Sequence, residues 1–203
     1  MFAARRILSK CSLISANKSN FSSLVLAEHY QGKLNANLSS TLTAAKHMDS
    51  EVDILVHGED PTAQIEAVQN YPGINRIFVA KDASLENAYG DSVARITKAL
   101  VEKNGYTSVI AATTAFGKDV IPRLGGLLDV QPITDVIEII DSGAKFKRPV
   151  YAGNAIATVS TSDSIKLLTV RPTNFEKTEP ADANSYPTED AAIDLEGVAG
   201  TWI

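Results

Sequence analysis

The sequence predicts an α/β fold, in which a doubly wound, mostly parallel sheet is flanked by helices and extended at one edge by antiparallel strands. Two observations indicate this fold. Short apolar runs alternate with amphipathic stretches from residue 23 to about residue 130, as in repeated strand-helix-strand units. Beyond Val130, shorter apolar runs follow one another with no helical pattern between them. A length of 203 residues and a hydrophobic content of 44% suit one compact domain with appendages.

Four apolar runs lack the polar alternation of a half-exposed strand, so we expect strands that are buried on both faces. They comprise residues 23–27, 52–56, 76–80 and 108–112. The segments between them carry apolar residues at helical spacing, which predicts parallel pairing through right-handed crossovers. The helices are expected around residues 38–45, 65–69 and 91–103. Pro61 favours the start of the second helix, and Gly105 favours the end of the third.

The last third of the chain predicts a meander of short strands. The strands are expected at residues 134–140, 145–151, 155–160 and 165–170. Turn-forming residues separate them at Ser142-Gly143 and at residues 161–164. We therefore expect the last two strands to form a hairpin, in which Val159 meets Leu167 or Leu168. This meander would extend the parallel sheet at one edge.

The two ends of the chain have compositions of their own. Residues 1–21 are rich in serine and carry four basic residues, and no acidic residue precedes Glu28. This composition, with apolar residues that can share one side of a helix, predicts a mitochondrial transit peptide. A disordered basic tail has the same composition and stays an alternative. Residues 176–203 are acidic and turn-rich, so we expect a linker there.

Composition excludes several classes of function. Without the four basic residues before Glu28, the chain has fifteen basic and twenty-four acidic residues, and so a negative net charge. This charge argues against nucleic acid as a partner. The only cysteine is Cys11, so the predicted mature domain has no thiol for a disulfide, a metal site or a nucleophile. No apolar run approaches the roughly 18 residues of a membrane helix, and we expect no membrane insertion.

The loop after the fourth predicted strand lies where open α/β sheets bind ligands, at the carboxyl ends of the strands. It resembles a phosphate-binding loop only superficially, because Ala112 replaces the first glycine and Asp119 replaces the magnesium-binding hydroxyl. Backbone amides at a helix start, with a lysine beside them, can hold an anion or the backbone of a partner. An ordinary turn, with Gly117 for its conformation and Asp119 in the first turn, explains the same residues. The candidate residues are Thr113, Thr114, Phe116, Gly117 and Lys118.

No pattern indicates a catalytic or metal site. The three histidines His29, His47 and His57 occupy different elements, although His29 and His57 both follow strands and can line one edge. Asp135 and Glu138 would point to opposite faces of one strand, which gives general acid-base catalysis no support. Three further observations concern the residues after the candidate loop and the acids near it. We expect the helix to be interrupted at Pro122-Arg123 and at Gly125-Gly126. Arg123 is expected either to pair with an acid across an interface or to lie in solvent. Asp129 is expected to belong to no catalytic cluster.

Several stretches, in order along the chain, resemble the alpha subunits of the electron transfer flavoproteins. The most informative are residues 148–155, Arg-Pro-Val-Tyr-Ala-Gly-Asn-Ala, and residues 170–175, Val-Arg-Pro-Thr-Asn-Phe. Residues 24–29, 115–118 and 132–137 are also similar to that family. The resemblance covers residues 22–175 and implies the amino-terminal domain of an alpha subunit, with an adenine nucleotide alpha hydrolase-like fold.

The resemblance implies an alpha-beta heterodimer that carries electrons and is not itself an enzyme. One FAD takes electrons from acyl-CoA and other dehydrogenases in the mitochondrial matrix and passes them to a membrane quinone reductase. In that family the amino-terminal domain of alpha packs on the beta subunit, which holds an AMP, while the FAD lies mostly on alpha's second domain. No motif of that second domain occurs before Ile203, so we expect a chain truncated before the FAD domain, with no flavin-binding residue and no tightly bound cofactor.

Two other functions fit the same sequence. Alternating strands and helices also suit a free-standing nucleotide-binding module of the universal-stress type. A shortened alpha subunit can also sequester the beta subunit and lower the assembly of the flavoprotein.

Overall fold

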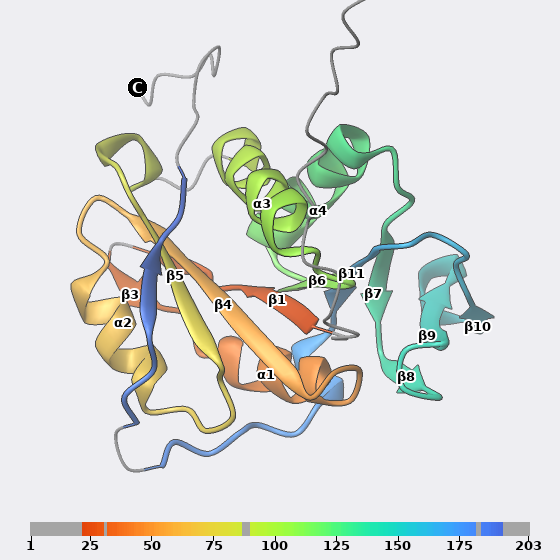
Figure 1. The fold of residues 1–203 in the computed structure, drawn as a ribbon. Coiled ribbons are helices and arrows are strands. Elements are labelled where there is room, and N and C mark those ends of the chain that lie inside the picture. The colour runs from red at the N-terminus through yellow and green to blue at the C-terminus, as the bar shows by residue number, and fades with distance from the viewer. Residues whose placement is uncertain (1–21, 31, 87–89, 182–183, 193–203) are drawn as a thin grey trace, which may run out of the picture.

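The computed structural model describes residues 22–30, 32–86, 90–181 and 184–192. The predicted transit peptide, residues 1–21, lies outside these described residues, as does the end of the predicted linker. Seven parallel strands form the main sheet in the order β12-β5-β4-β1-β6-β11-β7 (Figure 1). The strands are β1 (Ser22–Leu26), β4 (Glu51–Gly58), β5 (Arg76–Lys81), β6 (Ser108–Ala112), β7 (Ile133–Val136), β11 (Lys166–Val170) and β12 (Thr188–Asp190).

Helices cover both faces of this sheet, as the doubly wound prediction requires (Figure 1). The α-helices are α1 (Leu38–Lys46), α2 (Thr62–Gln69), α3 (Gly90–Asn104) and α4 (Ala115–Leu128). Apolar side chains of α3 and α4 pack with Leu24 and Phe78 on one face, and those of α1 and α2 pack with Val25 and Ile54 on the other. Gly105, at φ 72°, ends α3 as predicted. The predicted strands 23–27, 52–56, 76–80 and 108–112 are confirmed within one or two residues by β1, β4, β5 and β6.

The shorter elements lie mostly in the connections. They are β2 (His29–Tyr30) and β3 (Lys33–Leu34), which form a small ribbon, and the 3-10 helices η1 (Ala83–Leu85), η2 (Tyr151–Gly153) and η3 (Pro172–Asn174). A separate antiparallel sheet contains β8 (Glu138–Ile140), β9 (Lys145–Val150) and β10 (Ala155–Val159), in the order β10-β9-β8. Figure 1 shows this three-stranded sheet beyond β7, at the end of the main sheet opposite to β12. No helix among the described residues is long and apolar enough to cross a membrane.

The predicted hairpin between the last two strands of the meander is wrong. β10 pairs with β9, whereas β11 lies in the main sheet between β6 and β7 and is parallel to both. The reason is the burial of β11 on both faces, because Leu167 packs in the core beside α3 and α4 and Leu168 packs in the core beside α1. A strand that is apolar on both sides is stable inside a helix-covered parallel sheet and not in a ribbon.

Two further expectations need correction. Residues 134–140 form two strands instead of one, because β7 ends at Val136 in the main sheet and β8 begins at Glu138 in the antiparallel sheet. α4 also runs through Pro122, Gly125 and Gly126 without interruption. Val120, Ile121 and Leu124 are buried beneath it, and this burial outweighs the hydrogen bond that Pro122 cannot donate.

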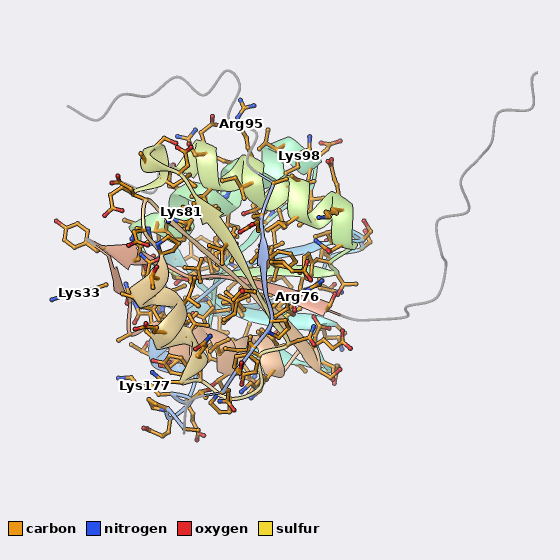
Figure 2. All side chains as sticks on the ribbon, turned by 60° about the vertical axis from the view of Figure 1, so that its left-hand side comes forward. Lys33, Arg76, Lys81, Arg95, Lys98 and Lys177 are labelled. Atoms are coloured by element: carbon orange, nitrogen blue, oxygen red, sulfur yellow. The ribbon has the colours of Figure 1, made fainter. Side chains whose placement is uncertain are left out.

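Part of the segment that we assigned to an acidic linker packs on the domain. Residues 188–190 pair with β5 as strand β12, and Ala191 is buried. Arg76 joins the two strands, since its Nη1 donates to Glu189 Oε1 at 3.2 Å and its Nη2 to Asp53 Oδ2 at 2.8 Å. Figure 2, turned so that this edge comes forward, shows Arg76 beside β12. The role of the remaining residues as a linker stays a prediction.

Candidate site at the carboxyl edge of the sheet

The predicted loop lies at the point where the strand order reverses. The chain runs from β1 to β4 and β5 on one side and then returns to β6 on the other side of β1. Thr114 is the N-cap of α4, and its Oγ1 accepts a hydrogen bond from the Gly117 amide at 3.3 Å. The Lys118 amide donates to the Thr114 carbonyl at 3.0 Å. Of the first-turn amides that an anion would need, that of Gly117 is therefore already paired with the cap, while the side chain of Lys118 is exposed.

A carboxylate stands beside this helix start. Glu28 follows β1, and its carboxylate is hydrogen-bonded by the Thr114 side chain and by Asn35 Nδ2, the latter at 2.9 Å. Burial raises the pKa of Glu28, although these two hydrogen bonds act in the opposite direction. When it is ionised, this carboxylate disfavours a second anion beside it. The contacts account for the loop as a capped turn, and its use for an anion or a partner stays a prediction.

Gly117 and Asp119 serve other purposes than expected. A Cβ atom on Gly117 would lie 2.0 Å from the Ala112 carbonyl oxygen, so the glycine permits a close approach between α4 and β6 and is not needed for a positive φ. Asp119 lies in the second turn of α4, where its Oδ1 accepts from Arg123 Nε at 2.8 Å. Arg123 thus pairs with an acid on its own helix.

The structure brings together His29, His57 and Phe116 at this edge. His29 Nε2 and His57 Nδ1 are 3.0 Å apart, both side chains are buried, and the ring of Phe116 stacks on His57 with centroids 5.5 Å apart. Burial, together with the nearby His29, lowers the pKa of His57 to about 3, and burial also lowers the pKa of His29 against the opposing charge of Glu86. Both rings are therefore neutral at pH 7. Among the described residues no cluster of three metal-ligating side chains occurs.

A second feature of the carboxyl edge is a hollow of about 600 Å³. It lies between the ends of β7 and β11 and the turn that joins β9 to β10. Its lining residues are Asp135, Arg148, Pro149, Val150, Tyr151, Ala152, Gly153 and Arg171. The two motifs that carry the family resemblance, residues 148–155 and 170–175, therefore meet in one place although they are far apart in the sequence.

Two arginines and one aspartate give the hollow a positive balance. Arg171 clamps Asp135 with two hydrogen bonds, from Nε at 3.1 Å and from Nη2 at 2.5 Å. Arg148 Nη2 donates to the Thr134 hydroxyl at 3.1 Å, and Arg148 Nε is buried without a hydrogen-bond partner among the described residues. Arg148 forms no salt bridge within the part of the chain that the structure describes. Of its nitrogens, Nη1 has no hydrogen bond within the described residues, whereas Nε is closed off from solvent.

Hydrogen bonds connect the hollow to the predicted loop. Thr113 Oγ1 donates to the buried Thr169 Oγ1 at 3.1 Å, and the Asp135 amide donates to the same oxygen at 2.9 Å. Asp135 then accepts from Arg171. A substitution of Thr169 would therefore remove a hydrogen-bond partner both from Thr113 in the loop and from Asp135, which holds Arg171.

The backbone of the hollow holds three residues other than glycine in the left-handed region. They are Asp135, Tyr151 and Ala152, with φ values of 63°, 51° and 54°. Left-handed backbone costs an L-residue about 1–2 kcal/mol. Such strain persists where the surrounding structure fixes it, and it gathers at sites that bind or switch.

The sequence predicted the loop at this edge but not the hollow. Asp135 and Glu138 were expected on one strand, and instead Asp135 pairs with Arg171 while Glu138 accepts from Lys147 Nζ at 2.8 Å. The signal that would have found the hollow was the pair of motifs itself, because each contributes an arginine to it.

Comparison with known proteins supports one family. The family model described as "Electron transfer flavoprotein domain" matches residues 23–195. The chain is 37% identical to the "Probable electron transfer flavoprotein subunit alpha, mitochondrial" of Caenorhabditis elegans over 98% of this chain and 61% of that relative. It is 40% identical to the "Electron transfer flavoprotein subunit alpha" of Pseudomonas aeruginosa over 75% of this chain and 48% of that relative. With the mitochondrial alpha subunit of Arabidopsis thaliana it shares 36% identity over 81% of this chain and 46% of that protein. The chain thus spans about half the length of these curated relatives.

Proposed function

Because this chain belongs to the electron transfer flavoprotein family, we propose that it acts as the amino-terminal domain of an alpha subunit in an alpha-beta heterodimer. Its role is to provide a scaffold and a contact surface for the beta subunit. The observation that carries the proposal is the coverage of the match, which extends over residues 23–195 and so over nearly all described residues. The chain carries no chemistry of its own and serves as part of an electron carrier.

The flavin belongs to other segments of the heterodimer in this proposal, because the residues present do not fit the diphosphate of FAD. Such a group needs free amides at a helix start next to glycines after the first strand. Here Glu28 and His29 follow β1 in place of glycines, and the first-turn amide of Gly117 already donates to the Thr114 side chain. FAD then binds only where the second domain of an alpha subunit is also present, and the AMP of the complex stays on the beta subunit.

The same contacts argue against a free-standing nucleotide-binding module. A phosphate at the start of α4 would stand near the Glu28 carboxylate, which is held in place by Thr114 and Asn35. We therefore expect no micromolar binding of ATP or AMP by the purified chain in calorimetry. Such binding would favour the universal-stress alternative.

The setting that we propose is the mitochondrial matrix, because several relatives are named as mitochondrial. There the complete flavoprotein would carry electrons from acyl-CoA and other dehydrogenases to a membrane quinone reductase. Import of the full chain into isolated mitochondria, with removal of residues 1–21, tests the location. A chain that stays outside and keeps its amino terminus would contradict it.

The proposed function is tested by mixing the full chain with the beta subunit from the same genome. Size exclusion with light scattering should give a one-to-one heterodimer, and its visible absorbance should lack the flavin bands. A chain that fails to associate with the beta subunit contradicts the proposal, and so does a chain that is yellow with bound flavin by itself. If the colourless heterodimer also prevents assembly of the complete flavoprotein, the chain acts by sequestering the beta subunit.

A further inference from the structure

The three-stranded sheet of β8, β9 and β10, which we call the arm, exposes apolar side chains at its tip. Among the described residues, three large hydrophobic side chains are strongly exposed: Tyr30 at 75%, Tyr151 at 82% and Ile156 at 61%. Two of these three lie on the arm, within six residues of one another. Exposed apolar side chains that gather in one place indicate a contact surface more than scattered ones do.

The arm also has a free strand edge. β8 pairs with β9 only at residues 145–147, so β9 and β10 continue beyond it as a two-stranded ribbon. β10 pairs only with β9 in the part of the chain that the structure describes. On the other side of the ribbon, Pro149 lacks the amide that an added strand would need. Ile156 lies directly opposite Pro149. An extended segment can therefore add to the arm along β10, beside Ile156.

The charge beside this edge selects the partner's chemistry. Arg148 lies opposite Ala157 in the ribbon and lines the hollow. Its Nε is buried and has no partner among the described residues, whereas Arg171 is already engaged by Asp135. The buried Nε cannot meet a carboxylate from outside and Nη2 already donates to Thr134, which leaves Nη1 for a charge-assisted hydrogen bond to a carboxylate. The partner segment is therefore expected to carry an aspartate or a glutamate.

The tip of the arm is fixed before any partner arrives. Tyr151 and Ala152 both adopt left-handed backbone, and the Asn154 amide closes the turn on the Tyr151 carbonyl at 3.2 Å. A preformed turn needs less ordering when it binds. The turn also keeps the side chain of Tyr151 exposed to solvent beside the hollow that the turn lines.

We propose that the arm docks an extended acidic segment of the beta subunit. The segment adds a strand to the free edge of β10, so that its alternating side chains cover Ile156, with Tyr151 at the tip, from one face and reach over the small Ala157 to place a carboxylate on Arg148 from the other. This inference rests on the proposed function, because it names the surface through which the heterodimer forms.

The test uses titration calorimetry between the full chain and the beta subunit. The double variant Tyr151→Asn/Ile156→Thr removes the exposed apolar surface, and each new residue suits its backbone, since asparagine tolerates a positive φ and threonine favours a strand. We expect Kd to rise at least about tenfold, as for central aromatic contacts. The matched control Tyr30→Asn changes a tyrosine of similar exposure on the β2–β3 ribbon and should leave Kd unchanged.

A second pair of variants tests the charge. Arg148→Gln should also raise Kd about tenfold and reduce its dependence on salt, whereas Arg123→Gln, on the exposed ion pair of α4, should change neither. Thermal denaturation of each variant alone confirms that it is folded. If the wild-type chain binds the beta subunit and both arm variants bind equally well, the inference is wrong and the proposed function stands. If the wild-type chain does not bind at all, the proposed function itself fails.

Discussion

The main sheet ends on β12 at one edge and on β7, with the arm beside it, at the other (Figure 1). β12 is short, and its residues Thr188, Glu189 and Asp190 are polar and exposed. Arg76 fixes it to the core through Glu189 and Asp53. A short charged strand of this kind blocks further pairing at a sheet edge.

At the other end of the main sheet, the arm leaves a strand edge unpaired within the described residues. Among the residues that the structure describes, β10 pairs on one side only, Tyr151 and Ile156 are exposed, and the buried Nε of Arg148 has no partner. This difference between the two edges is what the proposed docking of the beta subunit on the arm requires. Changes in the closed part should therefore affect stability, and changes on the arm should affect association.

The largest loss of stability is expected at the anchor of the closed edge. The Asp53 side chain is 3% exposed and accepts hydrogen bonds from Arg76, Asn75 and the buried Tyr106. Asp53→Ala leaves Arg76 without its buried partner and should lower the free energy of unfolding in urea by about 3–5 kcal/mol. Glu102→Ala, which removes an exposed ion pair with Lys98, should cost less than about 0.5 kcal/mol. Equal losses for the two variants would mean that the edge is not anchored there.

Gly117 gives the next largest effect. Gly117→Ala brings a Cβ against the Ala112 carbonyl and should destabilise the domain by about 2–3 kcal/mol, because neither backbone can move freely. Gly126→Ala, in the same helix, meets no atom within 4 Å and should stabilise the domain by about 0.5–1 kcal/mol. Thermal melts of both variants measure the contrast. A stable Gly117→Ala variant would show that α4 and β6 are not in close contact.

The buried histidine pair predicts a dependence of stability on pH. The pKa of His57 is about 3 in the folded chain, against an ordinary value of 6.5. Below pH 6.5 the unfolded chain therefore binds a proton that the folded chain does not, and stability falls as pH falls, by about 1.4 kcal/mol for each pH unit. Above pH 6.5 this contribution to the pH dependence disappears. Urea unfolding from pH 7.5 to 4.5 should show a steeper decline for the wild type than for His57→Asn, and parallel curves would refute the assignment.

The smallest effect concerns the strained tip of the arm. Ala152 adopts φ 54°, which glycine tolerates without penalty, so Ala152→Gly should raise the free energy of unfolding by about 0.5–1 kcal/mol. Ala157→Gly, in the extended strand β10, should lower it instead. Both values come from urea unfolding of the single variants. If Ala152→Gly were destabilising like its control, the tip would not be strained.

The parallel core was predictable, because its signals are local. β1, β4, β5 and β6 are apolar runs, and α3 shows clear helical spacing. The pairing of β11 was not predictable, because its apolar residues fit a hairpin and a buried parallel strand equally well, and only burial on both faces decides between them. β12 carries no apolar signal at all, since its three residues are exposed.

The candidate site likewise contains some residues that the sequence predicted and others that it did not. The rule that ligands bind at the carboxyl edge led to Thr113, Thr114, Phe116, Gly117 and Lys118. It also placed His29 and His57 at that edge, although the 3.0 Å contact between the two rings depends on how the short strand β2 folds back onto the end of β4. Arg148 and Arg171 are 23 positions apart and meet only because β11 returns to the main sheet, which a linear pattern does not contain.

Hydrogen exchange of the full chain, with and without the beta subunit, tests most directly whether the two edges differ as described. We predict that amides of residues 155–159, on the free edge of β10, exchange more slowly in the complex, while those of residues 188–190 in β12 keep their rates. Slower exchange confined to residues 188–190, with no change in β10, would contradict the account.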